Sequence, residues 1–394
     1  MPEPLSKEER AEISELNQEI YRLSVLLENS ERERIRLLTA DPADPFDNPT
    51  EYREYGTCYA NIREETGAPG FKPGLDPPYY ERQKIKRYYM LAGLMLLLHF
   101  LFSNFAAQAL MSLLTKVIAS MNPDASQAAV SSYIRASSMI AGLNMIVYIV
   151  GNVGAALIGL HFLPKKLPDL LKTHDYSFKN TIQHALIALL LFFSSVYLSN
   201  LTEYIFSKLG YTTDTMNTSG IAVTRLGTFI MIVYTCIIAP ITEELFFRGM
   251  LLRAFSVVNQ RFGIFATALF FGLSHKNLPQ FIMAFIVGIF LAHITMRHDS
   301  IIPAVIVHIF INSTSELLSH IDTSGTNRLI MTFVIDIFII IGILAFIVFR
   351  GKNKLPLATP AQSRRGLPIA ATTILCMLAF IAELAYMILL ILSK

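Results

Sequence analysis

The chain has 394 residues, of which 53% are hydrophobic and 16% are charged, and its mean hydropathy is +0.46. Soluble domains carry about 25% charged residues, so this composition argues against a soluble enzyme, and a net charge of +3 gives no reason to expect nucleic-acid binding. Apolar segments of about 20 residues recur from Met90 to the C-terminus, each long enough to cross a lipid bilayer. We therefore expect an all-α, polytopic helical membrane protein.

A polar extension, residues 1–86, precedes the apolar segments. Ser6 and Glu9 have the spacing of a capping box that opens a helix. Apolar residues follow at alternating three- and four-residue spacing, which predicts a helix over 6–38. This helix is either a short coiled coil, through which the chain associates with itself or a partner, or an amphipathic helix packed on something nearby. Repeated prolines then predict an irregular linker over 39–81.

The three cysteines, Cys58, Cys236 and Cys376, are far apart and lack the spacing of metal ligands. Two of them lie inside apolar segments, so neither a disulfide framework nor a metal site is expected from them. No apolar segment precedes Met90, so the first span is expected to act as an uncleaved membrane signal.

The apolar segments predict about nine transmembrane helices in a membrane domain formed by residues 87–394. Their approximate limits are 89–118, 137–163, 180–208, 222–250, 262–275, 279–296, 300–319, 328–349 and 368–391. The fifth is short and is expected to be tilted or to begin in the interface. Lysine and arginine concentrate before the first span and in every second loop, which predicts a cytoplasmic N-terminus and an outside C-terminus in the cell membrane.

The densest group of ionisable residues in these spans lies near the end of the fourth. Charged groups in hydrocarbon are costly and are functional candidates. Glu244 and Arg248 are four residues apart, so they share a helix face and can pair. The adjacent Glu243 points about 100° away and has no partner within the helix, which suits it to accept a proton from water. Alternatively, both glutamates pair with arginines at a helix end.

A histidine is predicted to lie level with Glu243. If the fourth and fifth spans are antiparallel, positions equidistant from about residue 259 lie at the same depth. Glu243 is 16 residues before this point and His275 is 16 residues after it, so the two side chains could share a water. His275 could instead be a cap or interface residue at a helix end.

The seventh span carries His308 and Asn312, four residues apart and thus on one face. Glu316 continues that face. Together, the histidine and the asparagine could donate two hydrogen bonds to a developing oxyanion. Both could also be polar contacts between helices.

Taken together, these motifs resemble those of the CPBP family of intramembrane endopeptidases, which includes CAAX prenyl endopeptidases and bacteriocin-processing or immunity (Abi) proteins. The three matching motifs are Glu243-Glu244-x-x-x-Arg248, Phe271-x-x-x-His275 and His308-x-x-x-Asn312. The resemblance covers about residues 222–320, a quarter of the chain, which we take as the catalytic core.

The resemblance implies a glutamic-type peptide hydrolase without metal or other cofactor. Glu243 and His275 would activate the attacking water, while His308 and Asn312 would stabilise the oxyanion. Glu244 and Arg248 would be supporting residues that shape the site. The substrate would be a peptide or protein, such as a CAAX-type substrate or a peptide precursor, that could be lipidated or embedded in the bilayer.

Other classes of function remain open. Two histidines and one carboxylate suffice to bind zinc, so Glu243, His275 and His308 could form the site of a zinc-dependent membrane protease. A non-catalytic immunity or scaffold protein would keep the same cluster for binding or packing. Transport is less favoured, because the sequence lacks the internal repeat of secondary transporters.

Overall fold

The computed structural model describes residues 15–20, 22–24, 79–136, 139–163, 166–173, 177–211, 224–257, 260–321, 324–349 and 366–392. Within these ranges all regular structure is helical and none is strand, which confirms the all-α prediction. Of the predicted N-terminal helix, only residues 15–20 and 22–24 are described, and they are helical and exposed. The capping box and most of the proline-rich linker lie outside the described residues, and self-association through this segment stays a prediction.

The membrane domain begins with α3 (Tyr79–Leu101), π-helical η1 (Phe102–Ala106), α4 (Ala107–Met121), α5 (Gln127–Ala136), α6 (Met139–His161), α7 (Leu167–Leu170) and α8 (Phe178–Lys208). The core helix follows as α9 (Arg225–Val233), η3 (Tyr234–Ile238), α10 (Ala239–Glu244), η4 (Leu245–Leu251) and α11 (Leu252–Phe255). The remainder is α12 (Gln260–Leu273), α13 (Leu278–His298), α14 (Ile302–Ser319), α15 (Thr326–Phe349), α17 (Gly366–Ala371) and α18 (Ile374–Leu392). Helix α3 begins at Tyr79, and the linker predicted over 39–81 otherwise lies outside the described residues.

Seven helices in the described part of the chain are long and apolar enough to cross a membrane. They are Met139–His161, Phe178–Lys208, Arg225–Phe255, Leu278–His298, Ile302–Ser319, Thr326–Val348 and Ile374–Leu392. Two shorter apolar helices, Gln108–Met121 and Gln260–Leu273, overlap the first and fifth predicted spans. The chain is therefore a multi-pass membrane protein, while the count of nine spans stays a prediction.

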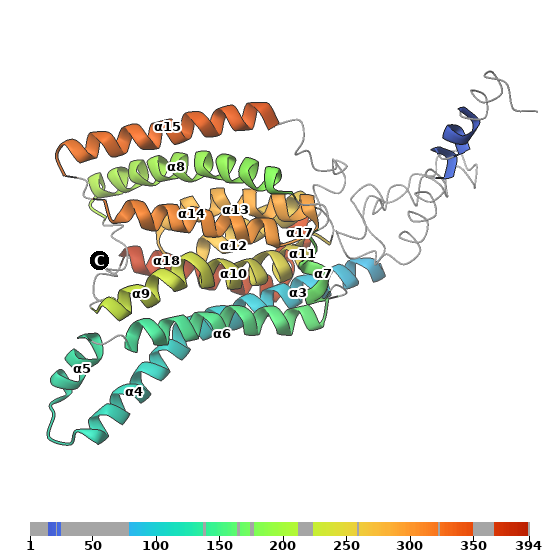
Figure 1. Ribbon diagram of the computed structural model, residues 1–394. Coiled ribbons are helices and arrows are strands. Elements are labelled where there is room, and N and C mark those ends of the chain that lie inside the picture. The colour runs from blue at the N-terminus through green and yellow to red at the C-terminus, as the bar shows by residue number, and fades with distance from the viewer. Residues whose placement is uncertain are drawn as a thin grey trace, which may run out of the picture.

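The long helices run roughly parallel or antiparallel in one bundle, with α10, α12, α13 and α14 near its middle (Figure 1). Helix α15 packs along α8 at one side, and α18 packs against α3. Helices α4 and α5 extend away from the bundle. The start of α3 and the short helices α7, α11 and α17 lie at one end of the bundle, and α18 ends at the other (Figure 1).

Helix α18 is anchored to α3 by close backbone packing. Gly93 lies so near α18 that a Cβ atom there would clash with the backbone of Leu375 and Cys376. The Cys376 thiol donates a hydrogen bond of 2.7 Å to the Tyr89 carbonyl oxygen. Tyr89 itself is fully buried and donates from its hydroxyl to the Phe255 carbonyl oxygen at 3.2 Å. The last helix is therefore held firmly against the centre of the bundle.

Two π-helical segments interrupt the core helix, one on each side of α10. Pro240, at the start of α10, has no N–H group, so the usual hydrogen bond to the carbonyl four residues earlier cannot form. A π-helical turn before the proline accommodates this loss. Such turns are frequent at functional sites, and here they flank the segment that carries Glu243 and Glu244.

Candidate active site

A buried ion pair lies at the centre of the site. Arg248 Nη1 is 2.8 Å from Glu244 Oε1, and neither side chain is exposed. Arg248 Nη2 also donates to the Gly288 carbonyl oxygen at 3.3 Å, which links the core helix to α13. The guanidinium carbon lies 4.3 Å from the centroid of the Phe271 ring, a distance at which cation and ring attract. The pair predicted from the four-residue spacing is present.

His308 joins this pair to Glu243. Its Nδ1 atom lies 2.8 Å from Glu244 Oε1, and its Nε2 atom lies 3.8 Å from Glu243 Oε2. The Phe271 ring packs edge-on against the imidazole, with centroids 5.8 Å apart. One carboxylate oxygen of Glu244 therefore serves both Arg248 and His308. The sequence did not predict this contact, because nothing in the spacing of Glu244 relates it to α14.

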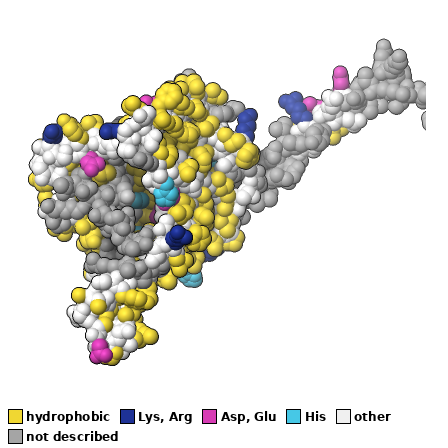
Figure 2. Space-filling model, turned by 60° about the vertical axis from the view of Figure 1, so that its left-hand side comes forward, with side chains coloured by type: hydrophobic (Ala, Val, Ile, Leu, Met, Phe, Trp, Pro, Cys, Tyr) yellow, Lys and Arg dark blue, Asp and Glu magenta, His cyan; other side chains and the backbone are white. Residues whose placement is uncertain are grey.

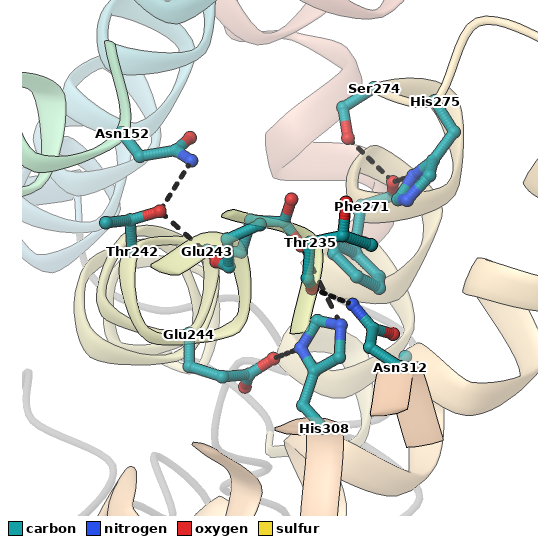
Figure 3. A network of polar contacts seen from close by, with 12 residues as sticks. Asn152, Thr235, Thr242, Glu243, Glu244, Phe271, Ser274, His275, His308 and Asn312 are labelled. Carbon is teal, nitrogen blue, oxygen red and sulfur yellow. Dashed lines mark hydrogen bonds and ion pairs between the residues drawn. The ribbon is translucent and has the colours of Figure 1, made fainter. Parts of the chain in front are cut away.

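Glu243 differs from its neighbour in access. Its side chain is 20% exposed, whereas that of Glu244 is 0% exposed. Glu243 projects from α10 toward the region around which His275, His308 and Asn312 lie (Figure 3). The prediction that the two glutamates have different surroundings therefore agrees with the structure.

Two tyrosines near Glu243 were missed by sequence reasoning. The rings of Tyr148 in α6 and Tyr234 in η3 lie 5.9 Å apart, and both hydroxyl groups interact electrostatically with the Glu243 carboxylate. No sequence signal could have singled them out, because tyrosine is common in membrane helices near the membrane–water interface.

His275 lies in the turn that follows α12. Its Nδ1 atom is 2.8 Å from the Phe271 carbonyl oxygen, and its ring packs edge-on against the Phe271 ring at 5.0 Å. If Nδ1–H donates this bond, Nε2 carries a free lone pair. The His275 side chain belongs to the same site as Glu243 (Figure 3). Within the described part of the chain, no hydrogen bond joins the two side chains directly.

Asn312 lies on α14 one turn beyond His308. Its Nδ2 atom donates to the Thr235 carbonyl oxygen in η3 at 2.9 Å, so the π-helical segment orients the amide. Glu316, on the same predicted face, instead lies 3.5 Å from His320 Nε2 and does not extend the site.

A second polar contact supports α10 from the opposite side. Asn152 in α6 donates to the Thr242 hydroxyl at 3.2 Å, and Thr242 in turn donates to the Ala239 carbonyl oxygen at 3.2 Å (Figure 3). His99 of α3 stacks on Phe246 with centroids 4.9 Å apart. The structure thus packs Asn152 and His99 directly against the core helix.

The face where α9 begins and α18 ends is hollowed, with histidine side chains in and beside the hollow (Figure 2). This face is opposite the end that carries the predicted cytoplasmic loops (Figure 1). Counting from Gln260, the first residue of α12, His275 lies 15 residues along, roughly 22 Å at 1.5 Å per residue. The site is therefore deep in the bundle as seen from the predicted cytoplasmic end.

No group of three or more histidine, cysteine, aspartate or glutamate side chains could hold a metal ion within the described ranges. Glu243, His275 and His308 do not converge as a set of ligands. The geometry thus offers no support for the zinc alternative.

The fold defines a multi-pass helical membrane protein, and the polar cluster at its centre has the residue types of an intramembrane hydrolase. Residues 225–314 match the family model described as type II CAAX prenyl endopeptidase, Rce1-like. The matched segment covers less than a quarter of the chain and includes all six residues from Glu243 to Asn312 predicted for the site. This match confirms the resemblance to the CPBP/CAAX protease family that the motifs showed. No curated protein and no solved structure matches the chain.

The two adjacent glutamates should differ in their effect on stability. Glu244→Gln leaves Arg248 buried without its counter-charge, and we expect it to lower the free energy of unfolding by about 3–5 kcal/mol. Glu243→Gln, the matched control one residue earlier, should change it by less than about 1 kcal/mol. Unfolding of the two purified variants in detergent measures both values. Equal losses would contradict the division between a structural and an accessible carboxylate.

Proposed function

We propose that this protein is a glutamic-type intramembrane endopeptidase, in which Glu243 and His275 activate a water molecule to hydrolyse peptide bonds. The observation that supports this best is the contrast between two neighbouring carboxylates. Glu244 is neutralised by Arg248 and bonded to His308, while Glu243 is accessible and lies beside them. The match to a CAAX protease family supports peptide hydrolysis as the reaction.

The attacking water would lie between Glu243 and His275. Glu243 accepts a proton as the water oxygen attacks the carbonyl carbon of the scissile bond. His275 orients the water through Nε2, because its Nδ1 atom is engaged with Phe271. The neighbouring Glu244 cannot take this role, since it is buried and already bonded to Arg248 and His308.

The oxyanion formed by this attack would be stabilised by His308 and Asn312. Glu244 Oε1 accepts a hydrogen bond from Arg248, so His308 Nδ1–H is the donor in the contact with that same oxygen. In its imidazolium form, His308 then has a second donor at Nε2, on the side of Glu243. The Asn312 amide, bonded through one N–H to Thr235, has a second N–H to offer.

Collapse of the tetrahedral intermediate completes the reaction. The C–N bond breaks, and the proton held by Glu243 passes to the leaving nitrogen. The products are a free amine and a carboxylic acid, which passes its proton to the amine or to solvent, and Glu243 returns to its ionised form. All of these steps use side chains of this chain.

The substrate we propose is a peptide or protein segment that reaches the hollow from the bilayer or from the adjacent aqueous side. CAAX-type substrates and peptide precursors both fit this description, and the family match favours the former. A zinc-dependent reaction would be eliminated by cleavage that persists in a metal chelator. A non-catalytic role would be indicated by a cellular phenotype that survives Glu243→Gln.

Glu243→Gln and His275→Ala should each abolish cleavage of a fluorogenic farnesylated CAAX peptide by the purified protein. Each change removes a group needed to activate water and leaves the buried Glu244–Arg248 pair intact. Glu203→Gln, on the exposed side of α8, is the matched control and should keep wild-type activity. Full cleavage by both site variants would refute the assignment.

Asn312→Ala should lower kcat by roughly 10²–10³ if its amide is an oxyanion donor. The KM should change little, because the interaction forms mainly in the transition state. Ser315→Ala, at an exposed position of the same helix, serves as control. A loss confined to KM would assign Asn312 to substrate binding instead.

For the orientation, we propose a cytoplasmic extension of residues 1–86 and an outside C-terminus, on the basis of the lysine and arginine distribution. In a Cys58→Ser background, Ser207→Cys should then react with a membrane-impermeant thiol reagent on intact cells. Thr173→Cys, at the opposite end of α8, should react only after permeabilisation. The reverse pattern would invert the orientation and place the hollow on the cytoplasmic side.

A further inference from the structure

The residue after His275 has an unusual backbone. Lys276 has φ of 61°, in the left-handed region that residues other than glycine seldom adopt. Its side chain is also nearly buried, with 9% of the residue exposed. A strained residue persists only where its surroundings hold it in place. The turn that carries His275 therefore has a constraint outside its own segment.

That constraint lies on α18. Lys276 Nζ is 5.5 Å from the centroid of the Tyr386 ring, within range of a cation–π attraction. Glu383 is three residues earlier on the same helix face, and only 2% of it is exposed. Because Lys276 lies over Tyr386, the Glu383 carboxylate one turn earlier is on the helix face that meets the Lys276 side chain, and the two groups interact electrostatically. An opposite charge nearby lowers the free-energy cost of burying each of these groups in the apolar environment.

The helix that supplies this carboxylate is a rigid support. Close packing at Gly93 and the hydrogen bond from Cys376 hold α18 against α3. Phe380, one turn before Glu383, packs edge-on against Phe270 of α12 with centroids 6.4 Å apart. Helix α18 is thus fixed relative to α12, the helix that precedes the His275 turn, although α18 lies outside the segment that matches the protease family.

The other acidic residue deep in a late helix makes a different contact. Asp336 of α15 accepts a hydrogen bond from the Tyr197 hydroxyl at 3.0 Å and lies on the outlying α8–α15 pair. It gives a matched control, because it is also a carboxylate within an apolar helix but is remote from His275.

We propose that Glu383 of α18 is a positioning residue for His275, acting through Lys276. The carboxylate holds the Lys276 side chain against α18, and this contact maintains the left-handed turn that directs the His275 ring toward the site. The proposal deepens the proposed function and rests on it for its catalytic consequence. It also assigns a role to the C-terminal helix.

The test compares Glu383→Gln, Lys276→Met, the double variant and Lys276→Arg, with Asp336→Asn as control. With the fluorogenic farnesylated CAAX peptide, Glu383→Gln and Lys276→Met should each lower kcat about tenfold to 10²-fold, with KM changed less than twofold. The double variant should be no worse than the poorer single variant. Lys276→Arg should keep at least half of the wild-type kcat, and Asp336→Asn should keep the full wild-type kcat.

A second measurement does not depend on proteolysis. In ¹⁵N-histidine-labelled full-length protein, the His275 signals are identified by their loss in His275→Ala. Wild type and Lys276→Arg should show one sharp set with Nδ1 protonated, whereas Glu383→Gln and Lys276→Met should show broadened or multiple sets.

Additive losses in the double variant, or unchanged His275 signals in both single variants, would overturn the proposal. If wild type cleaves no peptide but the His275 signals respond as expected, the proposed function fails and the positioning contact stands. If cleavage depends on Glu243 and His275 but not on Glu383 or Lys276, the contact fails and the function stands.

Discussion

The site depends on the two interactions that the buried carboxylate of Glu244 makes. This carboxylate neutralises Arg248 on its own helix and bonds His308 on α14, at 2.8 Å in each case. A buried charge without partners would be strongly destabilising, so three polar side chains in an apolar bundle fix one another. Arg248 extends the network to α13 through Gly288. Helices separated in the sequence are thereby held in one register around Glu243.

Much of this site was predictable because helical spacing is a local property. The four-residue separation of Glu244 and Arg248 and that of His308 and Asn312 place each pair on one face, and the structure keeps both arrangements. Glu243 and His275 are equally far from residue 259 along the sequence, which predicted that they lie in the same region. The bilayer also makes ionisable residues rare, so each one in a span stood out.

Contacts between distant segments were not predictable in the same way. The bond from His308 to Glu244 and the amide contact of Asn312 with Thr235 depend on how α14 packs against the core helix. The two π-helical segments of the core helix were not predicted. Pro240 indicates an interrupted helix, but it does not indicate that the interruption is π-helical. The first helix began earlier than expected, since its polar start has no hydrophobic signal. Nothing in the spacing of Glu383 relates it to Lys276, and only the packing of α18 brings the two residues together.

The shortness of α12 has a consequence for the supply of water. Its 14 residues span about 21 Å, less than the roughly 30 Å of a hydrocarbon core. The turn bearing His275 therefore ends inside the thickness of the membrane, where irregular backbone is tolerated only within protein or beside water. Where this helix stops short of the far surface, the turn that follows must be covered by the neighbouring helices or by water. The proposed hydrolysis needs water at this depth, so the length of α12 bears directly on how that water would be supplied.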